Sequence, residues 1–77
     1  MAYNPELTEE LNILARYNLK TSQEGIKIHS SATPEVISAA QRLFDKNLIS
    51  QSDGGYLTGL GRKAAELAQD LLAIMDN

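Results

Sequence analysis

Residues 33–46 carry three side chains able to hydrogen-bond to the edges of bases or to phosphate oxygens. These are Ser38, Gln41 and Arg42 in the stretch TPEVISAAQRLFDK. Arginine and glutamine can make paired hydrogen bonds to base edges in the major groove of DNA, and serine can bond to several bases. This chemistry requires a helix that presents the three side chains on one solvent-exposed face.

Five further bases are candidates for contacts with a polyanion, because affinity for nucleic acid rises with the number of phosphates neutralised. They are Lys20, Lys27, Lys46, Arg62 and Lys63. The formal net charge is −3, but residues 11–65 hold all seven bases and only four of the ten acids, which leaves this segment at +3. A basic middle between acidic ends is a pattern that can mark a binding face.

Residue types needed for catalysis or metal binding are scarce. The chain has no cysteine and a single histidine, His29, which we interpret as structural or solvated. The adjacent Glu9 and Glu10 are expected on a helix surface, and the stretch GLGR lacks the spacing of a dinucleotide-binding motif. We therefore expect no enzymatic activity, no cofactor, no bound metal and no small-molecule substrate.

The chain length of 77 residues predicts one domain. The first residues lack the apolar segment of a secretory signal, and the longest clean apolar run, residues 71–75, is too short to cross a bilayer. We expect a cytoplasmic protein without a membrane partner.

Local signals predict three long helices and a hairpin. Asn4 followed by Pro5 predicts a helix over 5–17, and Thr33 followed by Pro34 predicts one over 33–46. Asn47 tolerates the left-handed conformation that ends many helices. Asp53 and Gly54 predict a tight turn with positive φ and therefore a hairpin over 48–58. Thr58 is the expected cap of a helix over 59–75.

Residues 21–29 allow two interpretations. Thr21 and Glu24 have the spacing of a capping box, which favours a short helix over 21–29. Gly25 disfavours that helix by about 1 kcal/mol relative to alanine. The alternation of apolar and polar residues in GIKIHS favours a strand instead.

The last predicted helix has a wide apolar face. Leu60, Leu67, Leu71 and Ile74 are expected to face the core. Ala64, Ala68, Leu72 and Met75 widen the stripe beyond what one small core needs, which predicts a homodimer interface at Ala68, Leu72 and Met75. The alternative is that the helix packs on the first helix and closes the core of a monomer.

Two longer stretches carry a family resemblance. TSQEGIKIHSSATPEVISAAQRLFDKNLIS resembles the helix-turn-helix of winged-helix transcription regulators, with Asn47 where glycine is usual. GGYLTGLGR resembles their wing and following helix. The two matches lie within residues 21–63, and the chain is also similar to a family of small bacterial proteins that carry only a DNA-binding label.

The resemblance implies a single winged helix-turn-helix domain over residues 1–77, mainly α with a small hairpin (α+β). It also implies a transcription-associated homodimer that binds double-stranded DNA with helix 33–46 in the major groove. The alternative is a protein–protein interaction module that does not bind DNA. The net acidity, the acidic Asp53 at the wing tip and the neutral charge of helix 33–46 favour this alternative.

Overall fold

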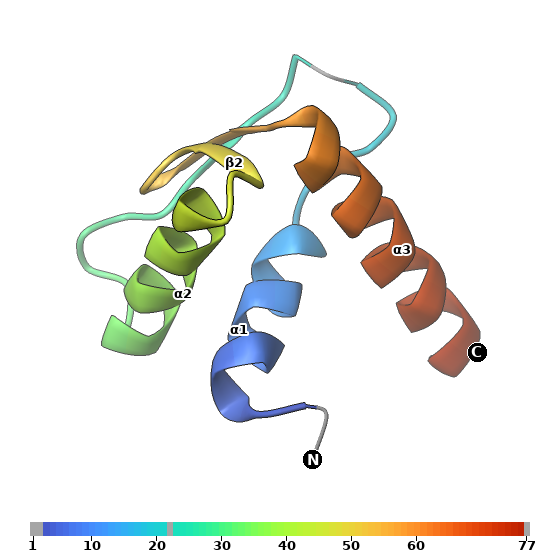
Figure 1. The fold of residues 1–77 in the computed structure, drawn as a ribbon, viewed down its shortest axis with the longest axis horizontal. Helices are drawn as coiled ribbons and strands as arrows, with labels where there is room; N and C mark the ends of the chain where they lie inside the picture. Colours follow the sequence, from blue (N-terminus) through green and yellow to red (C-terminus); the bar gives the residue numbers. More distant parts are fainter. Residues whose placement is uncertain (1–2, 22, 77) are drawn as a thin grey trace.

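The computed structural model describes residues 3–21 and 23–76, which form three helices and a three-stranded antiparallel sheet. The elements follow in the order α1 (Pro5–Leu14), β1 (Ile26–Lys27), α2 (Pro34–Asp45), β2 (Ile49–Gln51), β3 (Gly54–Leu57) and α3 (Gly59–Met75). Helix α1 lies between α2 and α3, and the β2–β3 hairpin joins the end of α2 to the start of α3 (Figure 1). This arrangement is α+β, as predicted.

The helix starts follow the predicted caps. The Asn4 side chain accepts a hydrogen bond from the Leu7 backbone N–H at 2.7 Å, and the Thr58 hydroxyl accepts one from Gly61 at 2.9 Å. The Thr33 side chain similarly faces the Val36 N–H at 3.4 Å. Each cap satisfies a backbone donor that has no partner within its helix.

Helix α1 ends earlier than the predicted Tyr17. The chain leaves the helix after Leu14, and Tyr17 turns into the core, where only 4% of its surface is exposed. Its hydroxyl donates to the backbone carbonyl of Gly55 at 3.1 Å. A tertiary contact therefore ends the helix, and burial raises the pKa of Tyr17 to about 12.

The predicted wing hairpin is present, but its turn is displaced by one residue. Gln51 pairs with Gly54, so Ser52 and Asp53 form the turn. Positive φ falls at Gly54 (121°) and Gly55 (74°) rather than at Asp53. The predicted left-handed conformation of Asn47 is confirmed, with a φ of 63°.

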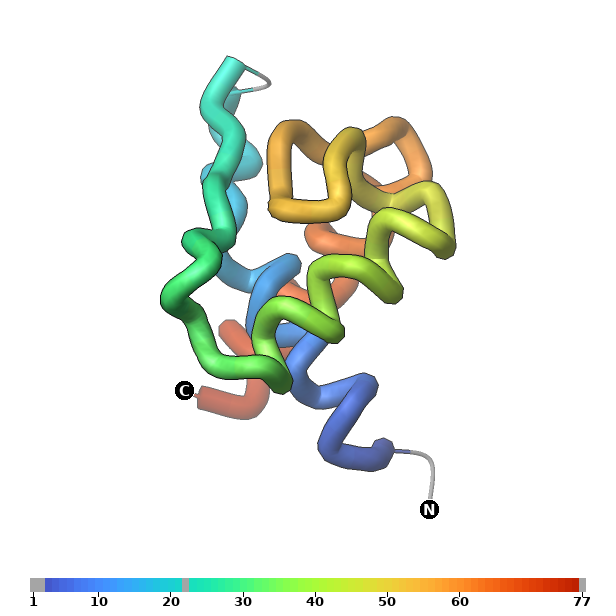
Figure 2. The backbone as a smooth tube through the Cα atoms, turned by 90° about the vertical axis from the view of Figure 1, so that its left-hand side faces the viewer, coloured from blue at the N-terminus to red at the C-terminus, as the bar shows by residue number. Residues whose placement is uncertain are grey.

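The predicted helix over residues 21–29 is wrong, and the strand alternative is confirmed. Ile26 and Lys27 pair with Gly55 and Gly54, which makes β3 the central strand of the sheet. The Thr21 hydroxyl accepts from Gln23 in a local turn instead of capping a helix. Beyond β1 the chain passes beside the hairpin and turns at Ser30 and Ser31 before α2 begins (Figure 2). Of the predicted helix-turn-helix, only the second helix is therefore formed.

The core lies where α1, α2, α3 and the sheet meet. From α2 it takes Ala39, Ala40 and Leu43, which lie on one face of the helix. The remaining buried apolar residues of this cluster are Ile13, Leu14, Tyr17, Ile28, Ile49 and Ala65.

Helix α3 presents a different face to the core from the one predicted. Gly61, Ala65 and Ala68 are its buried residues, whereas Leu60, Leu67, Leu71 and Ile74 are exposed. Small side chains allow the backbone of α3 to approach its neighbours closely, and a Cβ on Gly61 would overlap the carbonyl group of Leu48. The large side chains point away because the small ones occupy the inner face.

Candidate functional site

Two of the predicted DNA-binding residues on α2 are held by α1. Arg42 Nε donates to Glu10 Oε2 at 2.8 Å, and its Nη2 donates to the carbonyl oxygen of Glu6 at 3.0 Å. Lys46 forms an ion pair with the other oxygen of Glu10. Arg42 and Lys46 lie one helical turn apart, so both point toward α1. Neither is a free donor for a base or a phosphate.

Glu10 holds this arrangement together, and the prediction that it lies on a helix surface is wrong. Only 4% of its surface is exposed, and both carboxylate oxygens accept from cations. Burial acts to raise its pKa, but the hydrogen bonds from Lys46 and Arg42 outweigh burial and lower the pKa from its ordinary value of 4.5. The i, i+4 spacing of Arg42 and Lys46 indicates that they share one face of the helix, but it does not identify their partner.

Two more predicted phosphate contacts are also engaged within the chain. Lys27 forms an ion pair with Asp53 at the hairpin turn, and the hydrogen bond from Lys27 lowers the pKa of Asp53. Arg62 Nη2 donates to the carbonyl oxygen of Leu19 at 3.1 Å. The acidic wing tip thus neutralises the base nearest to it.

The other four predicted DNA-binding residues are exposed but lie on separate elements. Ser38 and Gln41 are on α2, where the Gln41 side chain donates to Asp45 at 3.0 Å. Lys20 follows α1, and Lys63 is on α3. The eight predicted DNA-binding residues therefore do not form one basic face.

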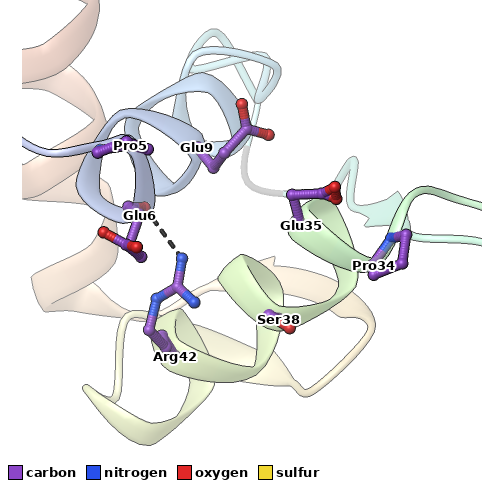
Figure 3. A pocket seen from close by; sticks show the side chains of 7 residues that line it. All are labelled: Pro5, Glu6, Glu9, Pro34, Glu35, Ser38 and Arg42. Carbon is purple, nitrogen blue, oxygen red and sulfur yellow. Dashed lines mark hydrogen bonds between the residues drawn. The ribbon is translucent and has the colours of Figure 1, made fainter.

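A hollow of about 300 Å³ lies between the starts of α1 and α2 (Figure 3). Ser38 and Arg42 line it, but so do the carboxylates of Glu6, Glu9 and Glu35. Because the Arg42 guanidinium is bound to α1, these three carboxylates leave the hollow acidic. It would therefore repel a phosphate group.

A second hollow, of about 420 Å³, lies between the exposed side of α2 and the hairpin turn. Lys27, His29, Gln41, Ser52 and Asp53 are among its lining residues. An adjoining hollow of about 200 Å³ shares Lys27 and His29 and adds Arg16. We call these two hollows the α2–wing surface. Among the described residues, this surface is where a helix face and the wing meet Arg16, Lys27 and His29.

An exposed apolar surface lies on α3. Six large side chains of this helix are each between 49% and 75% exposed: Leu60, Leu67, Leu71, Leu72, Ile74 and Met75. Of the three predicted dimer residues, Leu72 and Met75 are exposed, whereas Ala68 is buried. Large exposed apolar patches on small proteins mark interaction sites.

Residues 3–21 and 23–76 lack two features that other functions would need. Within these ranges no three histidine or acidic side chains cluster as metal ligands would. Over the same residues, no helix has the length and apolar character needed to cross a membrane.

Comparison with known proteins identifies one family. The sequence model of a family described as "Family of unknown function (DUF5669)" matches residues 1–76. No curated protein and no solved structure matches the chain.

Proposed function

The chain belongs to the DUF5669 family, and we propose that it is a winged-helix-like module that acts by binding another protein chain through α3. The observation that carries this proposal is the exposure of six large apolar side chains on one helix. A partner that covers these side chains removes their apolar surface from water, and the free energy of that burial drives association.

The order of elements supports a winged-helix-like layout. A helix, a strand, a second helix, a two-stranded hairpin and a closing helix follow one another, and β1 completes the sheet beside the hairpin. The layout differs from the usual one because no separate helix stands between β1 and α2. Folds of this kind serve more than one function, so the function must be inferred from the residues on the surface.

The side chains of α2 and the wing argue against groove reading by a single chain. Arg42 and Lys46 bind Glu10, and Lys27 binds Asp53. Pulling any of them onto a phosphate would break an existing ion pair. Because three of the seven bases are already ion-paired, the electrostatic contribution to DNA affinity would be reduced.

A titration of ¹⁵N-labelled protein with mixed-sequence duplex DNA, followed by NMR at low and then moderate salt, tests the proposal. We expect no salt-sensitive shifts at Ser38, Gln41 or Lys27. Salt-sensitive shifts clustered at these residues, and lost in a Gln41→Ala, Ser38→Ala variant, would overturn the proposal in favour of DNA binding.

DNA binding remains the second candidate, and the α2–wing surface is the observation that favours it. Arg16, Lys27 and His29 line one hollow, and Gln41 lines the hollow beside it. We propose this surface, rather than Arg42, Lys46 or Arg62, as the place where a duplex would contact the protein. In the titration, shifts at Arg16 and His29 together with Gln41 would identify this mode.

A further inference from the structure

Four of the six exposed large side chains of α3, together with the half-buried Ala64, follow the repeat of a coiled-coil seam. Leu60, Ala64, Leu67, Leu71 and Ile74 are spaced by four, three, four and three residues. This spacing keeps one stripe in line along a helix and is the pattern by which two helices pack side by side. We call these five residues the α3 seam. Its four large members point away from the core of their own chain.

We infer that the α3 seam pairs with the α3 seam of a second copy of this chain, antiparallel and across a two-fold axis. This inference rests on the proposed function, because it names the partner that covers α3. A two-fold interface requires a surface that is complementary to itself. The charges beside the seam meet this requirement in one orientation.

Lys63 and Asp70 lie seven residues apart along the same edge of the seam, and both are exposed. In an antiparallel pair, residues on the same edge of the two helices face each other. When Leu60 lies opposite the partner's Leu71, and Ala64 opposite the partner's Leu67, Lys63 falls beside the partner's Asp70. Symmetry then forms this ion pair twice.

A parallel pair lacks this complementarity. Lys63 would lie near the partner's Ala68, and Asp70 near the partner's Met75, so neither charge would meet its opposite. Parallel helices also place like ends of their dipoles together, whereas antiparallel helices place opposite ends together. The side-chain charges and the helix dipoles therefore both favour the antiparallel arrangement.

The surface beside the seam also fits this register. A shallow apolar hollow of about 160 Å³ lies between α1 and α3, lined by Leu11, Ala68, Leu71 and Leu72 among others. The partner's Leu60 lies opposite Leu71 and therefore next to this hollow. The side chain of the partner's Leu60 would therefore fill this hollow.

The self-association of the full-length chain tests the inference through a charge exchange. We expect Lys63→Asp to weaken the dimer roughly tenfold in sedimentation equilibrium, because two attractive pairs become two repulsive ones. Lys63→Asp combined with Asp70→Lys should restore the dimer to within about threefold. Lys20→Asp, with the same charge change outside the seam, should leave the dimer unchanged.

The orientation has a separate test, because the chain has no cysteine of its own. Residues 60 and 71 lie about 16 Å apart along one helix, too far for a disulfide within a chain. Under mild oxidation, Leu60→Cys with Leu71→Cys should form a covalent dimer, and Leu60→Cys alone should not. Efficient crosslinking of the single variant would show a parallel pair and overturn the inference.

A chain that stays monomeric at every concentration would also overturn the inference. That result is distinguishable from failure of the proposed function, which the DNA titration decides independently. A monomer that does not bind DNA would contradict the pairing but still support α3 as a docking surface for a different protein. A dimer that binds DNA would support the pairing of α3 but contradict the proposed function.

Discussion

At the residue scale, the ion pairs of Glu10 decide what α2 can do. Its buried carboxylate binds Arg42 of α2 and Lys46 at the C-terminal cap of that helix, so both cations connect α2 to α1. A buried carboxylate that lost these partners would be an uncompensated charge, which is strongly destabilising. Replacing Arg42 and Lys46 with glutamate would break both ion pairs and destabilise the fold. A loss of DNA binding in that variant could therefore not be assigned to a lost DNA contact.

We expect Glu10→Gln to lower the free energy of unfolding at pH 7 by about 2 kcal/mol. The lowered pKa of Glu10 means that its contribution is present above pH 4.5 and is lost as the pH falls through the folded-state pKa. Urea unfolding at pH 7 and pH 3 should therefore show a smaller acid-induced loss in the variant.

Glu9→Gln is the matched control, because Glu9 is on the same helix and forms no ion pair among the described residues. It should keep the wild-type stability at pH 7. Equal stability of Glu10→Gln and wild type would show that the buried pairs contribute nothing.

At the element scale, the start of α3 determines how the wing meets the helices. Thr58 caps α3 through Gly61 and also donates its hydroxyl to the Asn47 carbonyl at 2.7 Å. The Thr58 N–H donates to the Leu48 carbonyl at 3.1 Å, and Gly61 packs against the same carbonyl group. The chain therefore needs a residue without a side chain at position 61.

Gly61→Ala should lower the free energy of unfolding by about 2 kcal/mol or more, because its Cβ would displace the Leu48 backbone. Gly59→Ala is the matched control, since a Cβ at Gly59 would meet no atom within 4 Å. Alanine favours helices, so this control should be neutral or stabilising by up to about 1 kcal/mol. Thermal or urea unfolding of both variants compares them, and similar losses would contradict the close contact.

At the scale of the whole molecule, the apolar residues fall into two groups. The inner group closes the core of one chain through Leu43, Ile49 and the alanines of α2 and α3. The outer group lies mainly on α3, which carries six of the ten large apolar side chains that are exposed among the described residues, and it contributes little to that core. An exposed apolar surface of this kind on a small domain indicates an interaction site.

Substitutions in the two groups should therefore differ. Leu67→Gln should change the free energy of unfolding of the monomer by no more than about 0.5 kcal/mol, because Leu67 is 58% exposed and glutamine has a similar helix propensity. Leu43→Ala should cost about 2–5 kcal/mol, because Leu43 is 1% exposed. Urea unfolding at low protein concentration measures both, and equal losses would place α3's outer face in the core.

Signals that act over a few neighbouring residues were sufficient for much of the fold. The sequence alone determined the three capped helix starts, the turn from α2 at Asn47, the hairpin and the bounds of α3. Each of these depends on hydrogen bonds or backbone angles within about four positions of the residue that signals it.

Only the tertiary structure decided the rest. The capping-box pattern at Thr21 yielded to pairing between β1 and β3, a contact across more than 25 positions. Arg42 and Lys46 met a carboxylate 32 and 36 positions away, which no local pattern shows. On α3, the large and the small side chains both follow helical spacing. Periodicity reveals such stripes, but close packing against α1 and Leu48 selects the one that is buried.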